Sequence, residues 1–107
     1  MLIVTKEHIP NYEVQKVLGQ VFGVTVRSRG LAGNVTASLR TLIGGEIKEY
    51  TKMLEDARRH AIDRMVENAT ALGANAIVMM RFDSGEIGQT MSEIVAYGTA
   101  VVVREQA

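Results

Sequence analysis

The segment from Glu46 to Leu72 constrains the fold of this chain most, because its apolar residues return at three- and four-residue steps. That spacing places them in one stripe along an α-helix. Gly73 follows at the position where a helix most often ends on a left-handed residue. The sequence therefore predicts a long helix over 46–72 with one apolar face. Its stripe consists of Ile47, Tyr50, Leu54, Ala57, Ala61, Met65, Ala69 and Leu72.

Alternating or continuous apolar stretches predict strands on both sides of this helix. The predicted strands cover residues 2–5, 12–27, 76–87 and 90–104. The second is one long bent strand, or two with a kink, because Gly19 and Gly23 interrupt it. Asn34 can cap a short helix over 34–43. The glycine-containing region 85–88 joins the last two strands into an antiparallel hairpin. The order β–β–α–α–β–β describes an α+β fold, a two-layer structure with an antiparallel sheet packed on one long helix.

Four consecutive apolar residues, Ile77 to Met80, cannot all face one helix, because successive strand side chains point to opposite faces. Residues 100–103 are also apolar on both faces. The short helix at 34–43 has few side chains with which to cover the second face, and an exposed apolar patch marks an interface. We therefore expect self-association, with the far face of 77–80 closed by another copy of the chain.

The composition excludes several classes of protein. Twelve basic and twelve acidic residues are spread through the chain, so the basic patch that nucleic-acid binding needs is missing. No cysteine occurs, which excludes disulfides and thiolate metal sites. No apolar run approaches the roughly 18 residues of a membrane span, and MLIVTKEH is too short and too quickly charged for a signal peptide. We expect a single-domain cytoplasmic protein, 1–107, that binds neither nucleic acid nor membrane.

Candidate metal ligands are few and scattered. The two histidines, His8 and His60, lie in a predicted turn and on the long helix, and no HxxxH or HExxH spacing occurs. Carboxylates near the predicted hairpin tip could hold a hard cation or perform acid–base chemistry, although such groups are usually just solvated. These carboxylates are Asp83, Glu86 and Glu93. Met79 and Met80 could each ligate a soft ion, but adjacent strand residues point to opposite faces. A ring could bring His8 of one chain beside the carboxylates of another.

Gly30, Gly33 and Asn34 precede the predicted short helix, whose free N–H groups could hold a small anion, with Arg40 beside them. No Walker lysine follows, and the glycine spacing misses the dinucleotide fingerprint. An alternative is thus an enzyme that acts on a small anionic metabolite at a site assembled between chains. Its residues would be Arg40, Tyr50, Arg58 and the loop 30–34.

Four stretches, taken in order, are similar to the YbjQ-like family of small prokaryotic proteins: VLGQVFG (17–23), LRTLIGGEIKEYTKMLEDAR (39–58), LGANAIV (72–78) and YGTAVVV (97–103). The resemblance implies an α+β subunit of the dodecin-like kind that assembles into a pentameric ring through sheet faces and edges. The family carries a heavy-metal-binding label, has no settled activity, and supplies no catalytic residues. It shares with this chain a framework of small residues, whose simplest role is backbone geometry. The framework is Gly19, Gly23, Gly44, Gly45, Gly73, Ala74, Asn75 and Gly98.

These observations favour a ring-forming, homo-oligomeric binding protein over an enzyme, because the strands are apolar on both faces and no catalytic set is recognisable. Its ligand would sit at a subunit junction. The resemblance suggests a metal ion as the cofactor, whereas the lack of cysteine and of chelating spacing argues against a heavy-metal centre within one chain. A purely structural oligomer is a third interpretation, beside the enzyme with a site between subunits.

Overall fold

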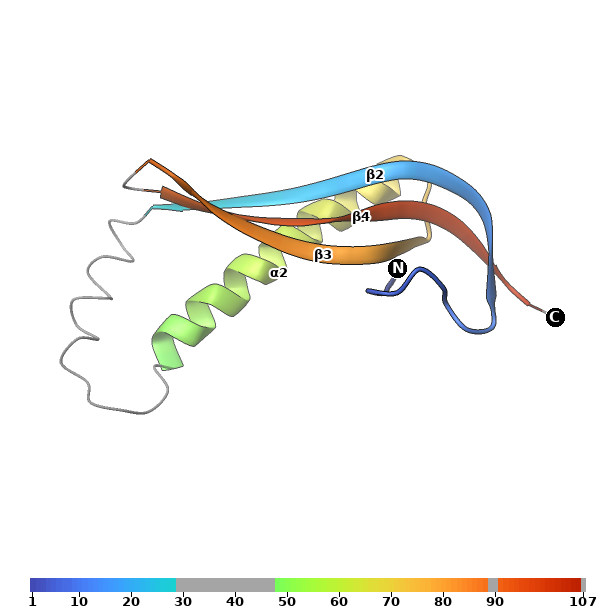
Figure 1. Ribbon diagram of the computed structural model, residues 1–107, viewed down its shortest axis with the longest axis horizontal. Helices are drawn as coiled ribbons and strands as arrows, with labels where there is room; N and C mark the ends of the chain where they lie inside the picture. Colours follow the sequence, from blue (N-terminus) through green and yellow to red (C-terminus); the bar gives the residue numbers. More distant parts are fainter. Residues whose placement is uncertain (29–47, 89–90, 107) are drawn as a thin grey trace.

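The computed structural model describes residues 1–28, 48–88 and 91–106, in which one long helix packs on a four-stranded sheet (Figure 1). The strands are β1 (Leu2–Ile3), β2 (Tyr12–Ser28), β3 (Ala76–Ile87) and β4 (Met91–Glu105), and the helix is α2 (Lys48–Ala71). Their order across the sheet is β1-β3-β4-β2. The three long strands are antiparallel, whereas β1 pairs in parallel with β3. The α+β class and the hairpin are confirmed, but the sheet is mixed rather than antiparallel throughout.

The helix ends as its sequence predicts. Gly73 has a φ of 91° and donates its N–H to the Thr70 carbonyl at 2.9 Å, and Ala74 donates to the Ala69 carbonyl at 3.0 Å. These two bonds close the last turn around a left-handed glycine. The predicted start of this helix at 46 and the predicted short helix over 34–43 lie outside the described residues.

Small residues bring α2 very close to β2. The buried face of the helix carries Ala57, Ala61, Met65 and Ala69. Gly23 of β2 lies directly under it, and a Cβ atom added there would overlap the Ala61 carbonyl oxygen and the Met65 amide nitrogen. The main core therefore forms between α2 and the sheet. Its buried members are Val21, Ala61, Met65, Ala69, Ile77, Met80, Ala96 and Ala100. Two members of the predicted stripe, Leu54 and its last residue Leu72, are exposed instead.

A bulge interrupts β3 and changes which faces its methionines occupy. Met79 has a φ of 56°, and the pairing with β4 slips between Val78 and Arg81. Met80 consequently joins Ile77 in the core beneath α2, while the Met79 side chain is 42% exposed. The simple alternation predicted for 77–80 is therefore broken, because the extra residue shifts the side-chain phase.

The N-terminal segment covers the opposite face of the sheet at this end. Figure 1 shows it curving back beneath the strands near the C-terminus. Val4 and Ile9 of this segment pack with Tyr12 against a second buried cluster, and the Val4 N–H donates to the Ile77 carbonyl at 3.0 Å. The strand residues of this cluster are Ala76, Val78, Val101 and Val103. The prediction that another copy closes the far face of 77–80 is thus wrong at Val78, which the chain's own first residues bury.

Candidate functional site

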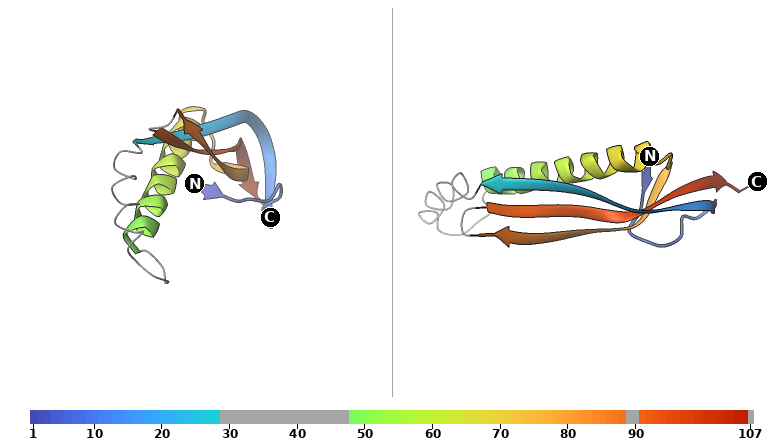
Figure 2. Two further views of the ribbon diagram at one scale, coloured as in Figure 1. Left: turned by 60° about the vertical axis from the view of Figure 1, so that its left-hand side comes forward. Right: turned by 90° about the horizontal axis from the view of Figure 1, so that it is seen from above.

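A groove lies between the N-terminal half of α2 and the outer part of the β3–β4 hairpin. Its volume is about 620 Å³, and Leu54 and Arg58 of the helix line one side of it. Phe82, Ser84 and Glu86 of β3 line the other side. Figure 2 shows α2 running alongside β2, with β4 between β2 and the outer part of β3. The groove therefore borders the part of β3 whose outer edge pairs with no described strand.

Among the described residues that line the groove, Arg58 is the cationic side chain. Leu54 and Arg58 are one helical turn apart, so both side chains point toward the hairpin. The Arg58 guanidinium carbon lies 5.3 Å from the centre of the Phe82 ring, which is a cation–π contact. This contact places the guanidinium beside the outer part of β3.

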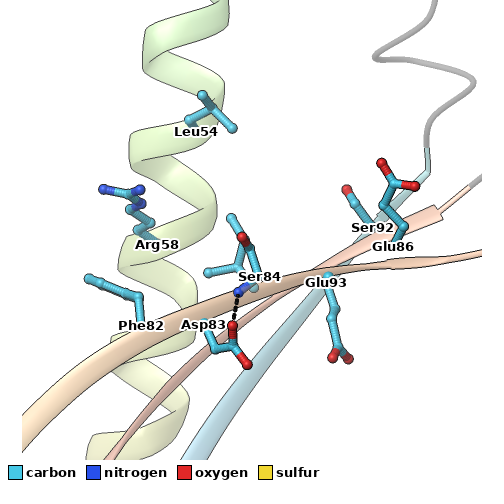
Figure 3. A pocket seen from close by; sticks show the side chains of 10 residues that line it. Leu54, Arg58, Phe82, Asp83, Ser84, Glu86, Ser92 and Glu93 are labelled. Carbon is cyan, nitrogen blue, oxygen red and sulfur yellow. Dashed lines mark hydrogen bonds between the residues drawn. The ribbon is translucent and has the colours of Figure 1, made fainter.

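The pleat of the hairpin separates the carboxylates that the sequence places together. Phe82, Ser84 and Glu86 alternate along β3 toward the groove, and Ser92 of β4 pairs with Glu86. Figure 3 shows Asp83 and Glu93 pointing to the opposite side of the strands from Ser84 and Ser92. Asp83 accepts a hydrogen bond from the Ser84 N–H at 2.9 Å. The predicted group of Asp83, Glu86 and Glu93 is therefore split between two faces.

Asp83 and Glu93 lie beside an exposed apolar area on the sheet face opposite α2. We call this area the sheet-face patch; it consists of Phe22, Val24 and Val26 of β2 and Tyr97 of β4. The pairing of Phe22 with Tyr97 and of Val26 with Glu93 places them on one face. All four side chains are between 38% and 48% exposed. Nothing in the described residues covers this part of the sheet, in contrast to the end that the N-terminal segment buries.

The two long edges of the sheet also differ. Helix side chains block the edge of β2: Arg64 donates to the Val24 carbonyl, and Asn68 donates to the Phe22 carbonyl at 2.7 Å. On the same edge the Arg27 guanidinium contacts Nδ1 of His60 at 3.1 Å. The other edge belongs to β3, which pairs with β1 only at Ala76 and Ile77. Beyond Met80, no strand in the described ranges lies against this edge of β3.

The histidines belong to segments other than the hairpin that carries these carboxylates. His8 is exposed in the N-terminal turn, and His60 is exposed on α2 beside Arg27. Among the described residues, no three histidine, aspartate or glutamate side chains are grouped so that they could hold a metal ion. The donor groups of the described residues therefore do not form a heavy-metal centre within one chain. The predicted anion site at Gly30, Gly33, Asn34 and Arg40 lies outside the described residues.

Sequence reasoning singled out Arg58 but missed its partners. Strand alternation directs Phe82, Ser84 and Ser92 to the groove side of the sheet. The sequence feature that indicates this is the run Phe82–Asp83–Ser84 within a predicted strand. Alternation along this run could have separated Asp83 from Phe82 and Ser84. It could not have shown that the helix leaves this face of β3 uncovered.

The fold and the groove show what kind of protein this is. It is a small α+β protein in which one helix crosses a strongly bent sheet and a groove lies beside one edge of that sheet. A helix able to cross a membrane is not found within the described residues. The model of the YbjQ family, described as "Putative heavy-metal-binding", matches residues 1–104. The chain belongs to this family.

Relatives and a solved structure agree with this assignment. A UPF0145 protein of Bradyrhizobium sp. (strain ORS 278) is 69% identical over 103 residues, covering 96% of this chain and 93% of the relative. A UPF0145 protein of Sulfurisphaera tokodaii is 60% identical over 103 residues, covering 96% and 90%. A crystal structure of a DUF74-family protein of unknown function from Pediococcus pentosaceus has a TM-score of 0.62 at 16% identity, covering 97% and 98%. The predicted family and fold are thereby confirmed, and the family has no established activity.

Proposed function

We propose that this protein is a homo-oligomeric binding protein that holds its ligand at a junction between subunits. The sheet-face patch is the observation that carries the proposal. Fully burying a large apolar side chain contributes about 1.5–3 kcal/mol. Phe22, Val24, Val26 and Tyr97 are 38–48% exposed, so covering each of them would contribute part of that amount. A second copy of the chain carries the same apolar patch and could therefore cover it.

The shape of the chain supports the same proposal. The radius of gyration is 17.3 Å, whereas a compact domain of about 100 residues has roughly 13 Å. An elongated chain buries less of its own surface and leaves more for contact with copies. The outer edge of β3 beyond Met80 presents backbone groups that a neighbouring strand can pair with, as open edges do.

The groove lies next to this open edge. Phe82, Ser84 and Glu86 belong both to the groove wall and to the free part of β3. A copy that added a strand along this edge would close the open side of the groove. The ligand would then sit between two subunits, in a site that neither subunit completes alone.

The family resemblance implies a ring of five subunits, and we propose that this protein assembles into such a ring.

Metal binding would need ligands from several copies, because the described histidines and carboxylates of one chain are not grouped. Asp83 and Glu93 border the sheet-face patch and would therefore lie near a neighbouring chain. We propose a small organic ligand in the groove, with a metal ion as the competing ligand.

Light scattering coupled to gel filtration at low micromolar concentration tests the assembly. We expect a discrete mass that is a multiple of 11.7 kDa. Phe22→Asp should shift the mass downward, because it places a charge in the patch. Leu72→Asp is the matched control: Leu72 is 49% exposed and Phe22 46%, but Leu72 lies at the end of the helix. A monomer in the wild type, or equal behaviour of both variants, would refute the proposal.

Elemental analysis of protein purified without an affinity tag decides between the two ligands. Stoichiometric metal in the purified assembly, retained through gel filtration, would favour the metal ion. Its absence, together with no binding on titration with divalent and monovalent soft metals, would leave the groove as the binding site of the assembly.

A further inference from the structure

We infer that the sheet-face patch packs against the same patch of a second copy, with the strands of the two sheets antiparallel, so that Glu93 of each copy meets Arg81 and Tyr97 of the other. This inference rests on the proposed function, in which another copy covers the patch. It adds which surface of that copy is used and which charged groups set its orientation.

Strand pairing arranges the side chains of this sheet face in three rows that run from β2 across β4 to β3. The rows are Phe22–Tyr97–Arg81, Val24–Val95–Asp83 and Val26–Glu93–Gly85. The first row ends in a cation, whereas the third row has a carboxylate at its centre. These two rows are four residues apart along β4, or roughly 13 Å. The patch therefore has a positive group at one end and a negative group at the other, with apolar side chains between them.

A two-fold axis that lies across the strands brings opposite charges together. It makes the two sheets antiparallel and lays the first row of one copy over the third row of the other. Phe22 then meets Val26 of the second copy, and Glu93 faces the row that holds Tyr97 and Arg81. Packed sheets keep their strand directions within about 30° of each other, so this alignment is one that sheets adopt.

The other aligned arrangement, with the two-fold axis along the strands, is less favourable. It would lay β3 of one copy over β2 of the other. Arg81 would then rest on Phe22, and Asp83 would rest on Val24. Covering a charged group with an apolar side chain is costly, so the charges of this face favour the antiparallel arrangement.

Arg81 is held in place within its own chain. Its Nη1 donates to the Thr5 carbonyl at 2.7 Å and to the Met80 carbonyl at 2.8 Å. A charged group that is already positioned loses less conformational freedom when a partner binds. Asp83, by contrast, lies on the outer strand and would face Asp83 of the second copy at the rim, where solvent and salt screen like charges.

A contact between the same surface of two copies is two-fold and therefore joins chains in pairs. The assembly then has an even number of chains, so that a ring of five would stack on a second ring. Native mass spectrometry should give an even multiple of 11.7 kDa. An odd number of chains would overturn the inference and keep the proposed function, because a different surface of the neighbour would then cover the patch. A monomer would remove both.

Charge reversal tests the pairing of residues. Glu93→Lys should raise the dissociation constant of the pair by about tenfold or more, measured as mass against protein concentration, because it opposes like charges. Asp83→Lys is the matched control: it makes the same charge change on the same face, and a change within about twofold is expected at the screened rim. Adding Arg81→Glu to Glu93→Lys exchanges the two charges and should restore most of the affinity.

Equal effects of the two lysine variants would overturn the inference, as would a double variant no tighter than Glu93→Lys alone. The response of the assembly to Phe22→Asp separates these failures from failure of the proposed function. An assembly that dissociates with Phe22→Asp but ignores charge reversal at Glu93 keeps the patch as the contact and removes the antiparallel arrangement.

Discussion

Replacing Gly23 by alanine should destabilise this protein more than any other single added methyl group on its described glycines. The backbone of α2 crosses β2 at this residue, and a Cβ atom would overlap the Ala61 carbonyl oxygen and the Met65 amide nitrogen. Neither obstacle is a side chain that can rotate away. The helix would have to move off the sheet by on the order of an ångström, which loosens a core packed at nearly crystalline density.

The expected cost follows from that geometry. Overpacking of a core usually costs about 1–3 kcal/mol, and collision with two backbone atoms places Gly23→Ala at about 3 kcal/mol or above. For a chain of this length, about 1 kcal/mol lowers the melting temperature by roughly 4 °C, so a drop of about 12 °C is expected. The backbone conformation of Gly23 does not add strain in the alanine variant, because Gly23 is not among the described glycines with a positive φ, which are Gly19, Gly73 and Gly88.

Urea denaturation followed by circular dichroism measures the free energy of unfolding, at one fixed protein concentration because association would add to it. Gly85→Ala is the matched control: its Cβ would meet only the Glu93 side chain, at 3.8 Å, so a change within about 0.5 kcal/mol is expected. Gly98→Ala should cost about 1–3 kcal/mol, because its Cβ would lie 2.7 Å from Cγ2 of the buried Ile77 and 3.0 Å from the Val78 carbonyl oxygen. If Gly23→Ala were no more costly than Gly85→Ala, the close seating of α2 on β2 would be refuted.

Other substitutions test the remaining supports of the fold. Asn75→Ala should cost about 2 kcal/mol in urea denaturation, because Asn75 bonds both the N–H and the C=O of Val103 at 2.7 and 2.8 Å. Asn68→Ala, which loses one exposed bond, should cost below about 1 kcal/mol, and equal losses for the two would contradict this reasoning. Met79→Gly should leave the free energy of unfolding unchanged or raise it by up to about 1 kcal/mol in the same assay, because glycine tolerates a φ of 56°. A clear loss of stability would mean that this exposed side chain contacts another molecule. Ile9→Ala should cost about 2–3 kcal/mol and speed amide exchange at the strand ends that Ile9 buries, so wild-type stability would argue against the seating of the N-terminal segment.

The groove beside α2 illustrates where sequence reasoning stopped. Arg58 was a candidate from sequence, but only as part of a group with Arg40 and Tyr50. Its actual partner is Phe82, which lies across the groove on β3. Asp83 and Glu93 looked like neighbours of Glu86, yet the pleat turns them to the opposite face (Figure 3). Contacts of this kind depend on the angle at which the helix crosses the sheet. That angle cannot be derived from residue spacing in the sequence.

The sequence by itself determined the elements. The long helix and its glycine stop, the bent second strand and the final hairpin all follow from local rules: a 3.6-residue period, a left-handed C-terminal residue and turn-forming glycines. The tertiary structure alone decided the bulge at Met79, the burial of Val78 under Ile9 and the side of the sheet that stays open. The physical reason is that a one-residue slip in strand pairing reverses every side chain beyond it. That slip is selected by contacts between segments far apart in the chain, such as the close approach of Gly98 to Ile77 and Met80.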